Sequence, residues 1–251
     1  MKILLPPSET KRPGGSGSPL DLEALALPGL HAERSAVIDA LVDLSADEEA
    51  ARSVLKLSAR QLGDIEHNRT LRHAATMPAV DRYTGVLFDA LDAATLSSAS
   101  RRWLDAHVWI HSAPFGPVGA LDPIPAYRLA AGTSLPGVAP LRRHWADATT
   151  DAIVEDAPAF VLDLRSEAYV ALGPVRDHLP SAYVRVVTDD DGGPRALNHF
   201  NKKSKGLLVR QLAETRPTLG SLRSLRRWAE RRGIVLRDGA DPGTLELVVS
   251  E

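Results

Sequence analysis

A basic segment near residue 200 has the residue types best suited to binding an anion. Residues 201–210 read Asn-Lys-Lys-Ser-Lys-Gly-Leu-Leu-Val-Arg, with three lysines and a glycine at the expected start of a helix. Helix starts and lysine side chains both attract phosphate or carboxylate groups. On a helix, Lys202, Lys205 and Gly206 would share one face. We interpret the segment as an anion-binding surface, and the alternative is a solvated helix face.

Polar residues also follow an expected buried strand at residues 159–164. Arg165, Ser166 and Glu167 come directly after this strand, at the kind of strand end where α/β sheets bind ligands. Glu167 could act as a general acid or base, or it could pair with a lysine. The same segment is equally compatible with a helix that begins at Ser166 as its cap.

Three smaller patterns have both a functional and a structural interpretation. Thr84 could cap a following helix, which is the simpler interpretation, while Gly85 would let a phosphate approach the backbone. Arg128 leaves a proline-rich segment and could clamp a carboxylate or phosphate, or form a structural ion pair. His107 and His111 lie on one face of an expected strand, but no third ligand is evident nearby, so we predict no metal site.

Composition narrows the classes of function. The chain has 251 residues, a formal net charge of -2, 44% hydrophobic residues and no cysteine. These values are typical of a soluble globular protein and exclude disulfides, thiolate metal sites and cysteine nucleophiles. Nucleic acid would have to bind a local basic patch, and a second arginine-rich stretch at residues 223–232 is more simply explained by solubility. The apolar start at residues 1–5 is too short for a signal peptide, so we predict a cytoplasmic protein without a membrane span or cofactor.

Strand-like and helix-like segments alternate along the chain without a long linker. This order predicts one mixed α/β domain over residues 1–251. A turn at 189–193 would join two paired strands at 183–187 and 196–200. The other expected strands lie at residues 3–5, 107–111, 159–164, 234–236 and 245–249. The expected helices lie at residues 31–44, 83–91, 96–105, 141–151, 204–215 and 218–232, with further helix after 45 and within 55–72.

Seven segments, taken in order, resemble the peroxide stress protein YaaA family. They are residues 4–11 (LLPPSETK), 83–85 (YTG), 112–116 (SAPFG), 121–129 (LDPIPAYRL), 144–145 (HW), 164–169 (LRSEAY) and 200–207 (FNKKSKGL). The resemblance implies a single-domain α+β fold with a central mixed sheet, surrounding helices and a helix-hairpin-helix-like element. It also implies a positively charged cleft that binds duplex or branched DNA. The implied role is to limit peroxide damage, linked to iron homeostasis.

Both lines of reasoning give one set of candidate residues for binding DNA or another anion. The set is Lys202, Lys203, Lys205, Arg210, Arg128, Tyr83, Thr84, Lys11 and Ser8. The alternative function is an enzyme acting on a small anionic or nucleotide-like substrate, in which Glu167 or Tyr83 moves a proton. Whether the protein is catalytic stays open at this point. We expect a monomer whose partner is DNA or a small anionic ligand.

Overall fold

A seven-stranded mixed sheet forms the centre of the fold. The computed structural model describes the backbone of residues 1–188 and 194–249 and the side chains of 1–188 and 200–249. Within these residues the strand order is β4-β3-β1-β6-β7-β9-β8, and β2 and β5 form a separate antiparallel pair. The strands are β1 (Lys2–Leu5), β2 (Met77–Pro78), β3 (Val108–Ser112), β4 (Gly116–Gly119), β5 (Pro123–Ile124), β6 (Val161–Asp163), β7 (Ser181–Thr188), β8 (Val235–Asp238) and β9 (Thr244–Val249).

The inner strands of the sheet run in one direction. β1 pairs in parallel with β3 on one side and β6 on the other, and the parallel pairing continues through β7 to β9. Only the edge strands β4 and β8 are antiparallel to their neighbours in the described sheet. The carboxyl ends of the parallel strands therefore lie along one edge, which we call the carboxyl edge. Chain segments leaving β1, β3 and β6 start side by side there, as they do at ligand sites of open α/β sheets.

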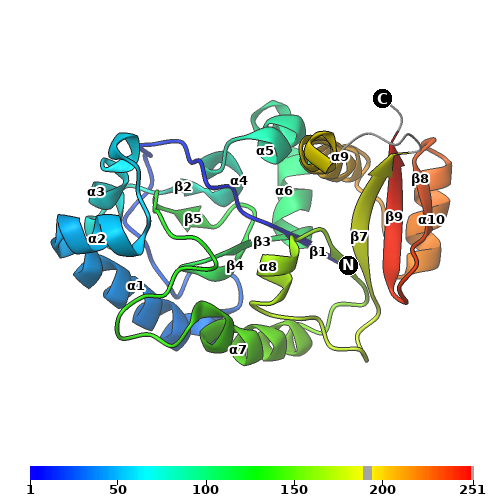
Figure 1. Cartoon of the computed structure of the whole chain (residues 1–251). Coiled ribbons are helices and arrows are strands. Elements are labelled where there is room, and N and C mark those ends of the chain that lie inside the picture. Colours follow the sequence, from blue (N-terminus) through cyan, green and yellow to red (C-terminus); the bar gives the residue numbers. More distant parts are fainter. Residues whose placement is uncertain (189–193, 250–251) are drawn as a thin grey trace.

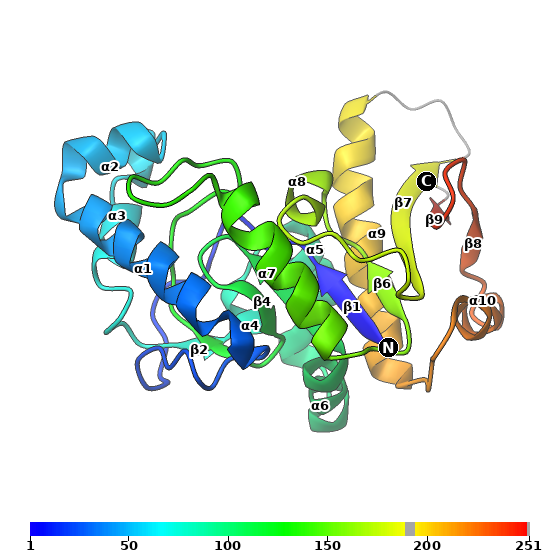
Figure 2. The same ribbon diagram turned by 90° about the horizontal axis from the view of Figure 1, so that it is seen from below.

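Helices cover both faces of this sheet. Figure 1 shows α5, α6 and α9 on one face and α7 and α8 on the other, and Figure 2 shows the same layers from below. The helix α10 packs beside β8 at the far edge. The helices are α1 (His31–Ala46), α2 (Glu48–Val54), α3 (Asp64–Arg69), α4 (Ala79–Arg82), α5 (Val86–Leu91), α6 (Ser98–His107), α7 (Leu141–Glu155), α8 (Glu167–Val170), α9 (Pro194–Thr215) and α10 (Leu222–Glu230).

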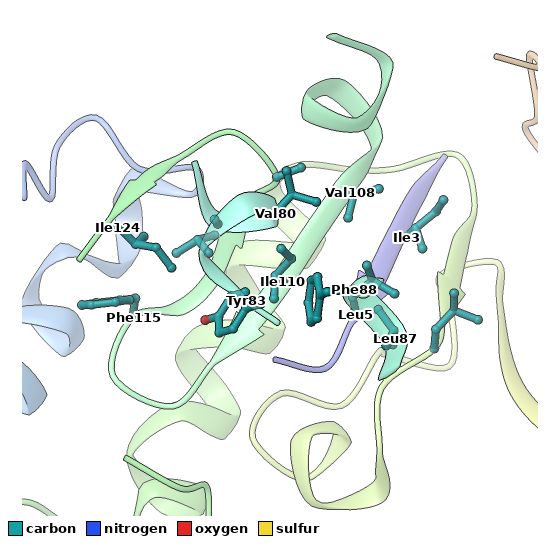
Figure 3. Packing of buried hydrophobic residues seen from close by; sticks show 14 of the residues in the cluster. Ile3, Leu5, Val80, Tyr83, Leu87, Phe88, Val108, Ile110, Phe115 and Ile124 are labelled. Carbon is teal, nitrogen blue, oxygen red and sulfur yellow. The ribbon is translucent and has the colours of Figure 1, made fainter. Parts of the chain in front are cut away.

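The short strand β1 shows why its sequence is continuously apolar. Ile3, Leu4 and Leu5 have no exposed surface. Leu4 packs on the α7 side against Ile153, whereas Ile3 and Leu5 belong to the larger cluster on the other face (Figure 3). Alternating side chains enter two different cores, so every position of such a buried strand must be apolar.

The expected mixed α/β class, with a central mixed sheet and surrounding helices, is confirmed. One expected strand is wrong: residues 196–200 lie in the first turns of α9, which begins at Pro194. The chain crosses over from β7 through α9, and β9 becomes the parallel neighbour of β7, so no hairpin forms there. The expected turn at 189–193 lies outside the described residues.

Two other local expectations need correction. His107 is the last residue of α6 rather than part of β3. The proline-rich segment at 113–127 contains the short strands β4 and β5, because Gly116 to Gly119 pairs back on β3. Residues Pro28–Leu30 form a 3-10 turn that leads into α1, and the helix-hairpin-helix-like element stays a prediction. None of the helices in the described segments is long and apolar enough to cross a bilayer.

Candidate anion-binding site at the carboxyl edge

The loop after β1 is fastened across the segment that precedes α5. The buried guanidinium of Arg82 donates hydrogen bonds to the carbonyl oxygens of Arg12 at 2.6 Å and Gly14 at 2.8 Å. Directly beside these contacts, Lys11, which precedes Arg12, and Tyr83, which follows Arg82, form an antiparallel bridge. These hydrogen bonds and the bridge fix the position of Lys11 at the carboxyl edge. Lys11 and Tyr83 lie more than seventy residues apart in the sequence.

Three hydroxyl groups gather beside this bridge. The hydroxyl of Thr84 donates to that of Thr10 at 3.0 Å, and the hydroxyls of Thr10 and Ser8 lie 3.2 Å apart. Thr84 does not cap α5, contrary to the simpler interpretation of its sequence pattern, because Gly85 occupies the cap position with no side-chain cap. Gly85 has φ of 94°, and a Cβ atom there would lie 3.3 Å from the hydroxyl of Ser8. A glycine is therefore needed where the two segments meet.

Lys11 places its amine against an aromatic ring. Its Nζ lies 4.0 Å from the ring centroid of Tyr127 and donates to the carbonyl oxygen of Glu9 at 3.2 Å. Burial, followed by the positive charge of Arg128, lowers the pKa of Lys11 to about 7. Among the described residues, no carboxylate forms an ion pair with this amine. The amine is thus close to half protonated at neutral pH.

The ring beneath Lys11 belongs to a buried tyrosine pair. The hydroxyl oxygens of Tyr83 and Tyr127 lie 2.8 Å apart, and each residue exposes 3% or less of its surface. Burial raises the pKa of both tyrosines above the ordinary value. Both hydroxyls therefore stay protonated at neutral pH. Tyr83 can donate a hydrogen bond or proton, but it is not suited to act as a base.

Arg128 is fixed at its backbone and held only loosely at its guanidinium. The side chain of Asn68 bonds both to the amide of Arg128 at 2.7 Å and to its carbonyl at 2.9 Å. Among the described residues, the guanidinium reaches the carboxylate of Glu9 at 3.6 Å and the carbonyl oxygen of Glu9 at 3.5 Å. The Glu9 side chain is 80% exposed, so this contact is a weak surface pair. We call the whole group the Lys11 centre; it comprises Ser8, Thr10, Lys11, Tyr83, Thr84, Tyr127 and Arg128.

A second cationic residue is buried on α9. Lys205 is 5% exposed, and its Nζ lies 5.7 Å from the ring centroid of Tyr183. Burial lowers the pKa of Lys205 to about 8, and the nearby carboxylate of Asp163 partly opposes this shift. No ion pair with Lys205 is present among the residues the structure describes. We call Lys205, Asp163, Arg165 and Tyr183 the Lys205 centre.

The carboxylate of Asp163 is already bound by its neighbour. Arg165 has no exposed surface and donates to both oxygens of Asp163, at 2.9 and 2.6 Å. Its third nitrogen lies 2.9 Å from Nδ1 of His111, which must accept this bond. Burial, followed by the positive charge of Arg165, lowers the pKa of His111 well below its ordinary value. His111 is thus a neutral structural residue, and the described residues contain no cluster suited to a metal ion.

The burial of Lys205 depends on the close packing of α9 on α5, which the next residue, Gly206, allows. A Cβ atom at Gly206 would lie 2.2 Å from the carbonyl oxygen of Leu87 in α5. We therefore expect Gly206→Ala to push α9 away from α5 and lower the free energy of unfolding by about 1–3 kcal/mol. Urea denaturation measures this loss. Gly63→Ala is the matched control, because Gly63 has φ of -60° and no atom near the added methyl group. Equal stability of the two variants would contradict the close packing of α9 on α5.

The remaining candidates lie in different surroundings. Lys202 and Lys203 are exposed on α9, eight or more residues after its first residue Pro194, so the basic segment does not open a helix as expected. Arg210 is held at the far end of α5, where it pairs with Glu214 at 2.9 Å and donates to the carbonyl of Leu91 at 3.0 Å.

Glu167 also differs from its two expected roles. It is the first residue of α8, preceded by Ser166 as a cap that makes no side-chain hydrogen bond. Its carboxylate lies 3.8 Å from Arg185 and is 83% exposed, so its partner is an arginine rather than a lysine. A carboxylate this exposed and paired with an arginine is poorly placed to act as a general acid or base.

The structure thus assembles two centres. Ser8, Thr84 and Arg128 share the surroundings of Lys11, whereas Lys205 interacts with Asp163. Helix α5 links the two centres, because it follows Thr84 of the first centre and packs on α9, which carries Lys205. Sequence reasoning missed three contributors, namely Tyr127 beneath Lys11, Asn68 behind Arg128 and the buried Arg82. Only the position of Tyr127 next to Arg128 could have suggested one of them.

Comparison with known proteins gives the family of this chain. By its fold, this chain is a mixed α/β protein, and its candidate cationic residues lie on strand-end loops and on one helix. The family described as "Peroxide stress protein YaaA" matches residues 1–233. A UPF0246 protein of Corynebacterium glutamicum is 41% identical over 99% of this chain and 100% of its own length. Another from Streptomyces coelicolor is 42% identical over 86% of this chain and 84% of its own. The chain therefore belongs to the YaaA (UPF0246) family of peroxide stress proteins.

Proposed function

We propose that this protein binds the phosphate groups of DNA at its carboxyl edge as part of a peroxide stress response. The observation that carries the proposal is that Lys205 is buried and Lys11 half-buried, and that neither forms an ion pair with a carboxylate among the described residues. A buried amine without a partner is unfavourable when charged. A bound phosphate supplies the missing negative charge, so it raises the pKa of both lysines and stabilises the folded protein.

The exposed lysines extend this surface along α9. Lys202 and Lys203 lie one turn before Lys205, on the helix that rises beyond the sheet in Figure 2. Flexible exposed lysines suit the phosphate backbone, because they contribute charge without reading bases. The affinity for DNA would then fall steeply with salt and depend little on sequence. The peroxide and iron-related roles belong to the same proposal and rest on the family alone.

Charge-matched double variants test the DNA proposal. We expect Lys202→Gln with Lys203→Gln to weaken binding to duplex and branched DNA and to reduce the salt slope by about 2, because two phosphate contacts are lost. Arg231→Gln with Arg232→Gln removes the same charge from exposed positions after α10. This control should leave the slope unchanged. The measurement is fluorescence anisotropy across a series of salt concentrations. Equal losses in both variants, or salt-independent binding, would overturn the proposal.

The Lys11 centre also favours a second candidate function, an enzyme acting on a small anionic or nucleotide-like substrate. Lys11 is the specific reason, because an amine that loses its proton near pH 7 is suited to chemistry as well as to charge pairing. In this case phosphorylated metabolites would raise the melting temperature of the protein. The shift should disappear in Arg128→Gln if the guanidinium holds the anion. A melting temperature that no such metabolite changes would argue against this candidate.

A further inference from the structure

We propose that Lys11 is a nucleophile that forms an imine with the carbonyl group of a phosphate-bearing ligand. The inference rests on the anion binding proposed above, since the anion is what brings the carbonyl group to the amine. It adds a covalent step and a class of ligand, namely an aldehyde or ketone that carries a phosphate group a few bonds away.

The geometry leaves the lone pair of the amine free to react. Lys11 is half-buried, its Nζ rests on the face of Tyr127, and its hydrogen bond goes to the carbonyl of Glu9. All of these contacts use the N–H groups or the charge of the amine, and a carbonyl oxygen cannot protonate it. The exposed lysines Lys202 and Lys203 have no comparable surroundings.

Burial and the adjacent Arg128 supply the chemical activation. They lower the pKa of Lys11 to about 7, so roughly half of the molecules carry the free amine at pH 7. An ordinary lysine, with a pKa near 10.4, has fewer than about one free amine in a thousand at that pH. Only the free amine attacks a carbonyl carbon, and enzymes lower the pKa of such lysines by desolvation or by a neighbouring cation. Lys11 has both features.

Arg128 and the hydroxyl cluster provide the place for the phosphate. The Arg128 backbone is fixed by Asn68, while the guanidinium, among the residues that the structure describes, is paired with the exposed carboxylate of Glu9 at 3.6 Å. A phosphate that displaces Glu9 would gain two parallel hydrogen bonds from the guanidinium. The hydroxyls of Thr10 and Thr84 lie on the same loop junction as Lys11 and can donate to the remaining oxygens.

The reaction balances without a cofactor. The amine nitrogen of Lys11 forms a bond to the carbonyl carbon, and the carbonyl oxygen becomes the hydroxyl group of a carbinolamine. One proton from solvent and this hydroxyl group then leave as water, which yields a protonated imine. No electrons are transferred. Two kinds of ligand carry an aldehyde near a phosphate. One is a phosphorylated metabolite, and the other is the open-chain sugar at an abasic position in DNA.

Borohydride trapping tests the proposal on the full-length protein. Glyceraldehyde 3-phosphate, unphosphorylated glyceraldehyde and an oligonucleotide with one abasic position are each incubated with the protein and reduced. Mass spectrometry of peptides locates the reduced adduct. We expect a single adduct on Lys11, at least about tenfold more than on Lys202 or Lys203. With glyceraldehyde the yield should rise with pH through about 7, and with the phosphorylated ligands the rise should lie at higher pH, because a bound phosphate raises the pKa of the amine. The phosphorylated aldehyde or the abasic oligonucleotide should react faster than glyceraldehyde, and whichever does so identifies the source.

Two outcomes separate this inference from the proposed function. Adducts spread evenly over the exposed lysines would overturn the nucleophile assignment, even if DNA binding and its salt dependence hold. Selective labelling of Lys11 without any preference for the phosphorylated ligands would overturn the assignment of the ligand class and count against anion binding here. Lys11→Arg keeps a positive charge at this position and should abolish trapping. Arg128→Gln should remove the preference for the phosphorylated ligands and also slow the reaction with glyceraldehyde, because the neighbouring cation that lowers the pKa of Lys11 is lost.

Discussion

Replacing Arg165 by methionine is expected to lower the free energy of unfolding by about 3–5 kcal/mol. The substitution removes both hydrogen bonds to Asp163 and the bond to Nδ1 of His111, while it leaves the Asp163 carboxylate only 6% exposed. A charge that is left buried without its partner carries its full desolvation cost. Urea denaturation at pH 7 measures the loss. A stability change below about 1 kcal/mol would contradict the structural role of this arginine.

The same substitution elsewhere provides the control. Arg176 also pairs with an aspartate, Asp151, at 3.2 Å, but the two side chains are 50% and 66% exposed. We expect Arg176→Met to change stability by less than about 1 kcal/mol, because exposed ion pairs contribute little. Adding Asp163→Asn to Arg165→Met should restore part of the lost stability, since it removes the unpaired charge. If the double variant loses as much stability as the two single variants together, Arg165 and Asp163 are not directly coupled.

Much of the fold was predictable from local patterns, namely apolar runs for strands and apolar periodicity for helices. The run Ile3-Leu4-Leu5 indicates a strand buried on both faces, and all three side chains are buried. Helix α1 begins at His31, as its periodicity predicts. The failed strand at 196–200 has a different cause. Five residues of weak alternation cannot distinguish a strand from the start of α9, because the parallel pairing of β7 with β9 decides that question at long range.

The candidate site was predictable in its residue types but not in its grouping. The lysines were identified, yet the sequence did not show that Lys205 is buried next to Asp163 while Lys202 is exposed. The contacts that define the Lys11 centre join residues far apart, such as Tyr83 with Tyr127 and Asn68 with Arg128, which are 44 and 60 positions apart. Helical spacing and motif order carry no information on such pairs. Only the tertiary structure reveals which cations lack a partner.

The Lys11 centre should make stability depend on pH in the alkaline range. The folded protein releases the Lys11 proton near pH 7, whereas the unfolded chain keeps it until about pH 10.5. The unfolded state therefore binds more protons between these values, and the free energy of unfolding rises with pH across this window. Relative to Lys11→Met, the free energy of unfolding of the wild-type protein should rise by about 2–4 kcal/mol between pH 7 and pH 10. This is less than the full pKa shift corresponds to, because Lys11 is only half-buried.

Urea denaturation of both proteins at pH 7, 8, 9 and 10 measures this gain. Lys202→Met is the control, because Lys202 is exposed and its curve should run parallel to that of the wild type. Parallel curves for Lys11→Met as well would mean that Lys11 is not desolvated. A bound phosphate ligand raises the pKa of the amine beside it, so saturating ligand should move the rise in stability to higher pH. A rise that stays near pH 7 with the ligand bound would show that the anion lies elsewhere, and would separate Lys11 from the proposed binding surface.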